Sequence, residues 1–151
     1  MKSQSKITIS RCHDAALIDS VSAELEPYLT WDQANKLPKG ADILSLPECI
    51  VVSVCVDGVV RGLGVLNGSE VHTLFLPSLR GKLAIEAGKK GLAWFFEHTK
   101  HNEITSYAFS HRPEVVVFAK LCGMEETHID DPGFTYDGNP IKRHNFKIER
   151  Q

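Results

Sequence analysis

Residues 70–98 read EVHTLFLPSLRGKLAIEAGKKGLAWFFEH, and this stretch decides the fold. Its first residues, 70–76, predict a β-strand, residues 77–82 (PSLRGK) predict a tight turn, and the remainder predicts an α-helix. A turn that leads into a helix leaves several backbone N–H groups without an intrahelical partner, and such groups bind anions. We therefore expect a small anionic ligand at this turn.

The helix expected after the turn has an inner face and a solvated face. Small and apolar residues recur at helical spacing on the inner face: Ala84, Ala87, Gly88, Gly91, Leu92 and Phe95. Charged residues occupy the opposite face: Glu86, Lys89, Lys90 and Glu97. A glycine inside a helix costs about 1 kcal/mol relative to alanine. Because both glycines lie on the inner face, we expect them to bring the helix close against a sheet.

Strands are expected on both sides of this stretch. The composition of a strand is found in residues 6–10, 50–56, 59–66, 71–76, 103–109, 124–129 and 145–148. Asp57-Gly58 and Asn67-Gly68 are two-residue hairpin turns, so the segments that they join form consecutive antiparallel strands. Two glycines in the strand at residues 59–66 indicate that another part of the chain packs closely there: Gly62 and Gly64.

Three further helical segments complete the expected order of elements. One begins after the predicted N-cap Asp14 and ends near Pro27, and residues 31–34 (WDQA) suggest a short helical turn. Another covers residues 114–121 after Pro113, with its apolar residues expected inward: Val117, Phe118 and Leu121. Residues 130–140 are rich in turn formers and are expected to form a loop. The order predicts a mixed α/β sheet flanked by helices.

Composition narrows the class of protein. The chain has 151 residues, 42% of them hydrophobic, and a formal net charge of −2, which predicts one domain over residues 1–151 without a nucleic-acid partner. No apolar run approaches the ~20 residues of a membrane span, and the first residues lack the apolar core of a signal peptide. The cysteines include no CxxC pair: Cys12, Cys49, Cys55 and Cys122. We expect reduced thiols in a cytoplasmic protein that does not bind a membrane.

Over residues 7–148, the order of elements and three motifs resemble the GCN5-related N-acetyltransferase (GNAT) superfamily. The hairpin at 56–62 (VDGVVRG) resembles the family's second and third strands. Residues 71–82 resemble its fourth strand and acyl-CoA turn, which commonly reads hydrophobic-Pro-x-x-Arg-Gly-Lys-Gly-x-Gly. Residues 112–124 resemble its final conserved helix. Short GNAT-like proteins of tailed phages, with a Pro-x-x-Arg-Gly-Lys turn and no second glycine, are similar as well.

The resemblance implies a GNAT-like fold, with a mixed, mainly antiparallel central sheet flanked by helices in a single domain. It also implies an acyl-CoA-dependent N-acyltransferase without a metal, in which an amine attacks acetyl-CoA directly through a tetrahedral intermediate. In the family, the diphosphate of coenzyme A lies over the helix N-terminus, and the pantetheine arm pairs with the fourth strand where the fifth splays away. The implied cofactor-binding residues are Leu74, Phe75, Leu76, Arg80, Gly81, Lys82, Leu83 and Ala84.

The sequence departs from the family pattern at both the turn and the final helix. Leu83 replaces the second glycine, and its side chain is expected to take up space that the diphosphate needs. Ala119 replaces the tyrosine that commonly acts as general acid, and Arg112 replaces a common asparagine. These departures favour an alternative: a catalytically degenerate GNAT-fold binding protein, such as a phage assembly factor or a modulator of a host protein.

Aminolysis of a thioester needs a base for the amine proton, a donor for the departing thiolate and a donor to the oxyanion. Glu70 and His72 lie two residues apart on a strand and share a face, so either is a candidate base. Tyr107, or alternatively Ser110 or His111, is a candidate donor. The alternative interpretation is structural: solvent-facing strand residues for the first pair, and sheet or loop residues for the rest.

Two other reactive groups have simpler interpretations. Cys122 precedes the glycine that closes a helix, where no helix N-terminus lowers the pKa of a thiol, so we expect a packed thiol. His98 and His101 have no third ligand at useful spacing, so we expect no metal site.

In the GNAT fold, the acceptor site is formed by the segment after the first helix and by the last hairpin, here residues 28–46 and 130–145. Neither segment contains a recognisable recognition motif. Trp31 borders the site, where it either stacks on a substrate or packs the protein. The expected partner is an amine acceptor, either a small molecule or a protein; the degenerate alternative requires a protein partner. A homodimer is possible in either case.

Overall fold

The computed structural model describes residues 5–28 and 38–151. The elements in these residues, in chain order, are β1 (Ile7–Arg11), α1 (Ala15–Leu25), the 3₁₀ helix η1 (Glu26–Tyr28), α3 (Gly40–Ser45), β2 (Cys49–Val56), β3 (Val59–Asn67), β4 (Glu70–Phe75), α4 (Gly81–His98), β5 (Glu103–Phe109), α5 (Pro113–Leu121), β6 (Glu125–Asp130), β7 (Thr135–Tyr136), β8 (Asn139–Pro140) and β9 (Arg143–Glu149). The predicted helical turn at residues 31–34 lies outside the described residues.

The central sheet has seven strands in the order β1-β2-β3-β4-β5-β9-β6. All neighbouring strands are antiparallel except β4 and β5, which are parallel. This arrangement confirms the predicted mixed, mainly antiparallel sheet flanked by helices. The prediction of a loop over residues 130–140 is wrong in part, because its second half forms the small separate hairpin β7–β8.

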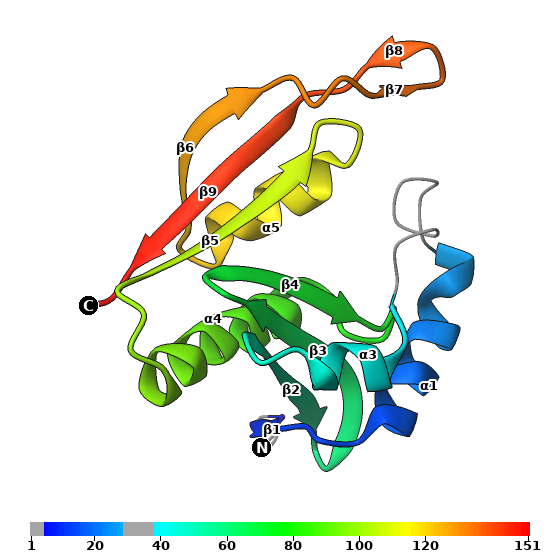
Figure 1. Ribbon diagram of the computed structural model, residues 1–151, viewed down its shortest axis with the longest axis vertical. Helices are drawn as coiled ribbons and strands as arrows, with labels where there is room; N and C mark the ends of the chain where they lie inside the picture. The colour runs from blue at the N-terminus through cyan, green and yellow to red at the C-terminus, as the bar shows by residue number, and fades with distance from the viewer. Residues whose placement is uncertain (1–4, 29–37) are drawn as a thin grey trace.

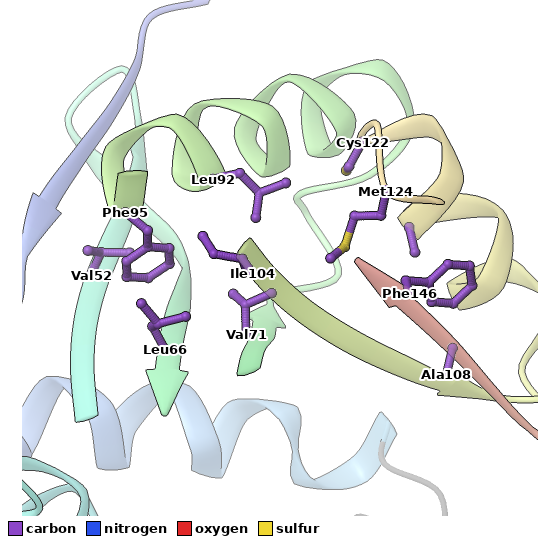
Figure 2. Close-up of a cluster of buried hydrophobic side chains, with 11 residues drawn as sticks. Val52, Leu66, Val71, Leu92, Phe95, Ile104, Ala108, Cys122, Met124 and Phe146 are labelled. Carbon is purple, nitrogen blue, oxygen red and sulfur yellow. The ribbon is translucent and has the colours of Figure 1, made fainter. Parts of the chain in front are cut away.

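Helices cover both faces of the sheet (Figure 1). On one face, α4 and α5 enclose a core cluster that includes Phe95, Ile104 and Phe146, each at most 1% exposed (Figure 2). On the other face, α1 and α3 bury Ile18 and Ile43 against β2, β3 and β4. None of the helices in the described ranges is long and apolar enough to cross a membrane.

Local signals in the sequence explain where the elements begin and turn. The Asp14 side chain caps α1 by accepting a hydrogen bond from the Leu17 N–H at 3.2 Å. At Gly62, an added Cβ would lie 2.8 Å from Cδ1 of Phe75, so only glycine allows β3 and β4 this close at that point. The close packing predicted for this glycine is thereby confirmed.

The inward face predicted for α5 is wrong in part. Val117 is 53% exposed and Leu121 is 52% exposed, whereas the buried side of the helix carries Phe118, Ala119 and Cys122. The segment VVVFAKL is apolar over most of a full turn, so its sequence does not fix which side faces the core. The contacts of α5 with α4 and β5 determine which side of the helix is buried.

The prediction that both glycines of α4 bring the helix close to the sheet is wrong. At Gly88, an added Cβ would meet α5, 2.5 Å from Sγ of Cys122 and 3.2 Å from Cζ of Phe118. At Gly91, an added Cβ would have no neighbour within 4 Å. The first glycine therefore permits close packing of two helices, and the second faces open space.

This difference predicts opposite effects of the same substitution on stability. Gly91→Ala should raise the free energy of unfolding by about 1 kcal/mol, because alanine favours the helix and no neighbour opposes it. Gly88→Ala should lower it by about 1–3 kcal/mol, because the added methyl overpacks the α4–α5 contact. Urea unfolding of the two variants measures both values, and stabilisation by Gly88→Ala would contradict the packing described.

Candidate functional site

The site lies where β4 and β5 separate. The two strands share a single registered pair, Glu70 with Thr105, and then diverge, while β5 continues along β9 (Figure 1). A cavity of about 480 Å³ occupies the gap and is lined by β4, β5 and the helices on both sides. This volume is within the usual range of small-molecule sites, roughly 300–1,000 Å³.

The gap leaves one edge of β4 without a neighbouring strand. The Leu76 N–H bonds to β3 and the Ser69 carbonyl accepts from Thr105, so odd-numbered residues direct their N–H and C=O groups toward β5. Beyond the last paired residue, these groups belong to Thr73 and Phe75, which both line the cavity. An extended ligand can pair with them as an added strand. The resemblance implied this pairing for residues 72–76, which include both Thr73 and Phe75.

The candidate catalytic residues lie together at this gap. Nε2 of His72 is 2.7 Å from Oε1 of Glu70, and the side chains are 41% and 44% exposed, respectively. The rings of His72 and Tyr107 meet edge to face with centroids 5.6 Å apart, although they come from different strands. A carboxylate, an imidazole and a phenol therefore line one accessible spot.

Arg143 and Asp130 extend this group, and sequence reasoning missed both. The Arg143 guanidinium donates two hydrogen bonds to Asp130, at 3.0 and 3.1 Å, and its Cζ lies 5.9 Å from the centroid of Tyr107. The hydrogen bonds from Arg143 hold the pKa of Asp130 below its usual range. In the sequence, the alternation of Arg143 and Asn145 indicates only that the two side chains share a face of a strand. Their neighbours on that face become known only when β9 pairs with β5 and β6.

A row of aromatic rings continues from the catalytic group toward the β7–β8 hairpin. Tyr107 contacts Phe109 with centroids 5.5 Å apart, and Phe109 contacts Phe134 at 6.3 Å. His111 lies against both Phe109 and Tyr136, with centroid distances of 6.0 and 4.8 Å. The hairpin belongs to the predicted acceptor segment, so these rings form a surface next to the gap on which an acceptor can rest.

The turn before α4 has the features of an anion site. Arg80 is the N-cap residue of α4 and makes no side-chain cap bond, so the N–H groups of the first turn face outward. Gly81 has φ +62°, and an added Cβ there would meet nothing within 4 Å. Arg80, Gly81 and Lys82 are exposed, with Nε of Arg80 donating to the Pro77 carbonyl.

The obstruction predicted from Leu83 is wrong. Its side chain is half-buried and packs against the cluster formed by Ile7, Val54, Ala84 and neighbouring residues. Because the helix directs this position into the protein, the leucine leaves the front of the turn open. The residues present therefore fit a bound diphosphate.

No protein-family model matches the sequence, and no curated protein matches it. Solved structures do match. A spermidine N-acetyltransferase chimera of the Vibrio cholerae and hSSAT proteins has a TM-score of 0.74, at 15% identity over 95% of both chains. The Vibrio cholerae enzyme in complex with CoA and spermine has a TM-score of 0.73, at 15% identity over 95% of both chains. A dodecameric structure of that enzyme has a TM-score of 0.72, at 14% identity over 95% of this chain and 93% of that one.

The chain has the GNAT fold. At these identities the likeness is one of fold, and the similarity to short proteins of tailed phages stays a prediction. The divergence of β4 and β5 agrees with the separation of the fourth and fifth strands that the resemblance predicted.

Other residues considered in the sequence have structural surroundings. Cys122 is buried with Sγ 3.9 Å from the Ile85 carbonyl, and burial raises its pKa to about 11. Oγ of Ser110 accepts a hydrogen bond from the Lys142 N–H at 2.8 Å. Within residues 5–28 and 38–151, no group of three or more His, Cys, Asp or Glu side chains is arranged to hold a metal ion. Trp31 lies outside the described residues.

The ion pair of Asp130 and Arg143 predicts a pH-dependent contribution to stability. Since the folded pKa of Asp130 is lowered, its stabilisation is present above the unfolded value of about 3.9 and is lost as the pH falls through the lower folded pKa. Asp130→Asn should therefore lower the melting temperature at pH 7, with the difference shrinking below about pH 4. Thermal melts of both proteins from pH 7 to pH 2 measure this difference, and a constant gap would contradict it.

Proposed function

We propose that the protein is an acyl-CoA-dependent N-acyltransferase that transfers an acetyl group from acetyl-CoA to an amine by direct attack. The observation that carries this proposal is the meeting of Glu70, His72 and Tyr107 at the gap between β4 and β5. Bound acetyl-CoA would supply an activated acyl group as a thioester. The protein's own residues bind it, move two protons and position the amine.

The turn before α4 provides the binding site for the diphosphate. The first-turn N–H groups donate to phosphate oxygens, and the helix dipole adds about 0.3–1 kcal/mol of attraction. Arg80 and Lys82 add positive charge, Gly81 adopts the positive φ of the turn, and Ala84 is buried behind it. From the turn, the ligand would run back along the open edge of β4, where Phe75 directs its N–H and C=O groups into the gap, whereas Leu74 and Leu76 direct theirs toward β3.

Proton transfer is assigned to the residues that meet at the gap. The Glu70–His72 pair takes the proton that the attacking amine loses, directly or through a water molecule. Tyr107 gives its hydroxyl proton to the departing thiolate, in place of the family's tyrosine at the position of Ala119. The nearby charge of Arg143 stabilises the phenolate left behind, because opposite charges attract at this distance.

The aromatic row favours an amine as the acceptor. Ring faces attract a cation by about 0.5–2 kcal/mol, and Tyr107, Phe109 and Phe134 lead from the gap to the β7–β8 hairpin. Three of the matching structures are named as spermidine N-acetyltransferases, one of them with spermine bound. The proposed acceptor is an amine on a small molecule or on a protein.

One observation favours the alternative of a GNAT-fold binding protein without catalysis. Ala119 is 8% exposed and has no proton to donate at the usual position of the general acid. Tyr107 can replace the missing general acid only if its hydroxyl donates a proton in the reaction. Binding and kinetics therefore separate the two functions.

Binding is tested by thermal shift. A ligand at 100 times its dissociation constant stabilises the protein by about 2.7 kcal/mol, which corresponds to a shift of several degrees. We expect this shift with acetyl-CoA and with CoA, and we expect Arg80→Ala to reduce it. Arg11→Ala is the matched control, because Arg11 is exposed on β1 and does not line the cavity. The absence of a shift at millimolar concentrations of either compound would overturn the proposal.

Catalysis is tested by removing one hydroxyl. Tyr107→Phe keeps the ring that contacts His72 and removes the proposed proton donor. In a thiol-release assay with a panel of amines, kcat should fall by about 10²–10⁴, while calorimetric binding of acetyl-CoA stays the same. Undiminished kcat in the variant would remove Tyr107 from the mechanism. Binding of acetyl-CoA without acetylation of any amine would favour the alternative function.

A further inference from the structure

The cavity continues past the place where the thioester would react. The proposed proton donor Tyr107 contacts His72, so the thioester would react level with His72 on β4. From there the cavity extends to Val71 on β4 and across to α4 and α5. On the opposite wall, the cavity reaches Gly91 and Leu92, about 15 Å along α4 from its first residue.

Small residues line the inner end of the cavity: Gly91, Ala108 and Ala119. Gly91 would have no neighbour within 4 Å of an added Cβ. Val71, Leu92 and Met124, which also line the cavity, are 7–8% exposed and pack in the same core cluster as Ile104. Figure 2 shows the side chains of Val71 on β4, Leu92 on α4 and Met124 just before β6 directed into the same interior.

The lining of the inner end is apolar. The residues there carry no charged side chain: Val71, Gly91, Leu92, Ala108, Ala119 and Met124. Burying an alkyl chain among them is favourable by about 0.8 kcal/mol per methylene, whereas a charged or strongly polar group would lose its hydration without a partner. Since the opening of this space lies beside the proposed thioester position on β4, its natural occupant is the acyl chain itself.

We propose that the preferred acyl donor carries a medium-length alkyl chain, longer than acetyl, which lies in the inner end between β4, α4 and α5. This inference rests on the proposed function and changes only the identity of the acyl group. The reaction is otherwise the same: the amine nitrogen forms a bond to the acyl carbon, the carbon–sulfur bond breaks, and the thiolate takes the proton given by the protein.

Calorimetric titration with a donor series tests the inference without relying on turnover. The probes are CoA, acetyl-CoA, butyryl-CoA, hexanoyl-CoA and octanoyl-CoA. We expect affinity to rise about fourfold per methylene until the inner end is filled, which is ~0.8 kcal/mol converted at 1.4 kcal/mol per tenfold. Affinity that is flat or falls from acetyl-CoA to octanoyl-CoA would overturn the inference and leave the proposed function standing. Failure to bind CoA itself would overturn both.

Two substitutions on α4 locate the chain. Gly91→Leu should fill the inner end of the cavity. The rise in affinity from butyryl-CoA to octanoyl-CoA should then be lost, while CoA still binds. Ala93→Leu makes the same change in size on the exposed side of the helix and should leave the series as in the wild type. Should Gly91→Leu fail to fold, Gly91→Ala, for which there is room, should shorten the chain length at which affinity stops rising. An unchanged series in either Gly91 variant would overturn the placement.

Discussion

The single parallel pair between β4 and β5 is the constraint on which the site depends. After Glu70 and Thr105, β5 turns to β9 and leaves the N–H and C=O groups of Thr73 and Phe75 without a strand partner. Backbone polar groups at such an edge favour a ligand that pairs with them. The same divergence brings His72 and Tyr107, on different strands, within ring contact. Binding groups and reactive groups therefore arise from one geometric cause.

The helices on one face pack against each other and against the open edge of β4. Because Gly88 has no side chain, Cys122 and Phe118 of α5 approach α4 closely. Phe118 in turn meets Phe75 edge to face with centroids 5.9 Å apart, which connects α5 to the open edge of β4. The turn that begins α4 and the strand edge that precedes it are thus parts of one packed unit. A ligand that binds at the turn meets a strand edge already in position.

Much of this fold and part of the site could be predicted from the sequence. Hairpin dipeptides, strand composition and helix capping act locally, so the strands, the turn before α4 and the pairing of Glu70 with His72 on one face follow from neighbouring residues. The orientation of α5 and the place of Leu83 depend on what the helices contact, which local patterns do not record. Arg143 joins Tyr107 and Asp130 only through the order of β5, β9 and β6 in the sheet.

The replacement of the family's tyrosine by Ala119 has two consequences that belong together. A tyrosine on α5 would direct a ring and a hydroxyl into the cavity; alanine leaves that volume open and apolar, on the side where Gly91 also leaves room. Among the described residues, Tyr107 is then the only one that brings a phenol to the cavity, on β5 and beside His72. If the proton donor has moved from helix to strand, the space it vacated is available to a longer acyl chain. Loss of the usual tyrosine is therefore compatible with catalysis, and it favours an acyl-CoA substrate with an acyl chain longer than acetyl.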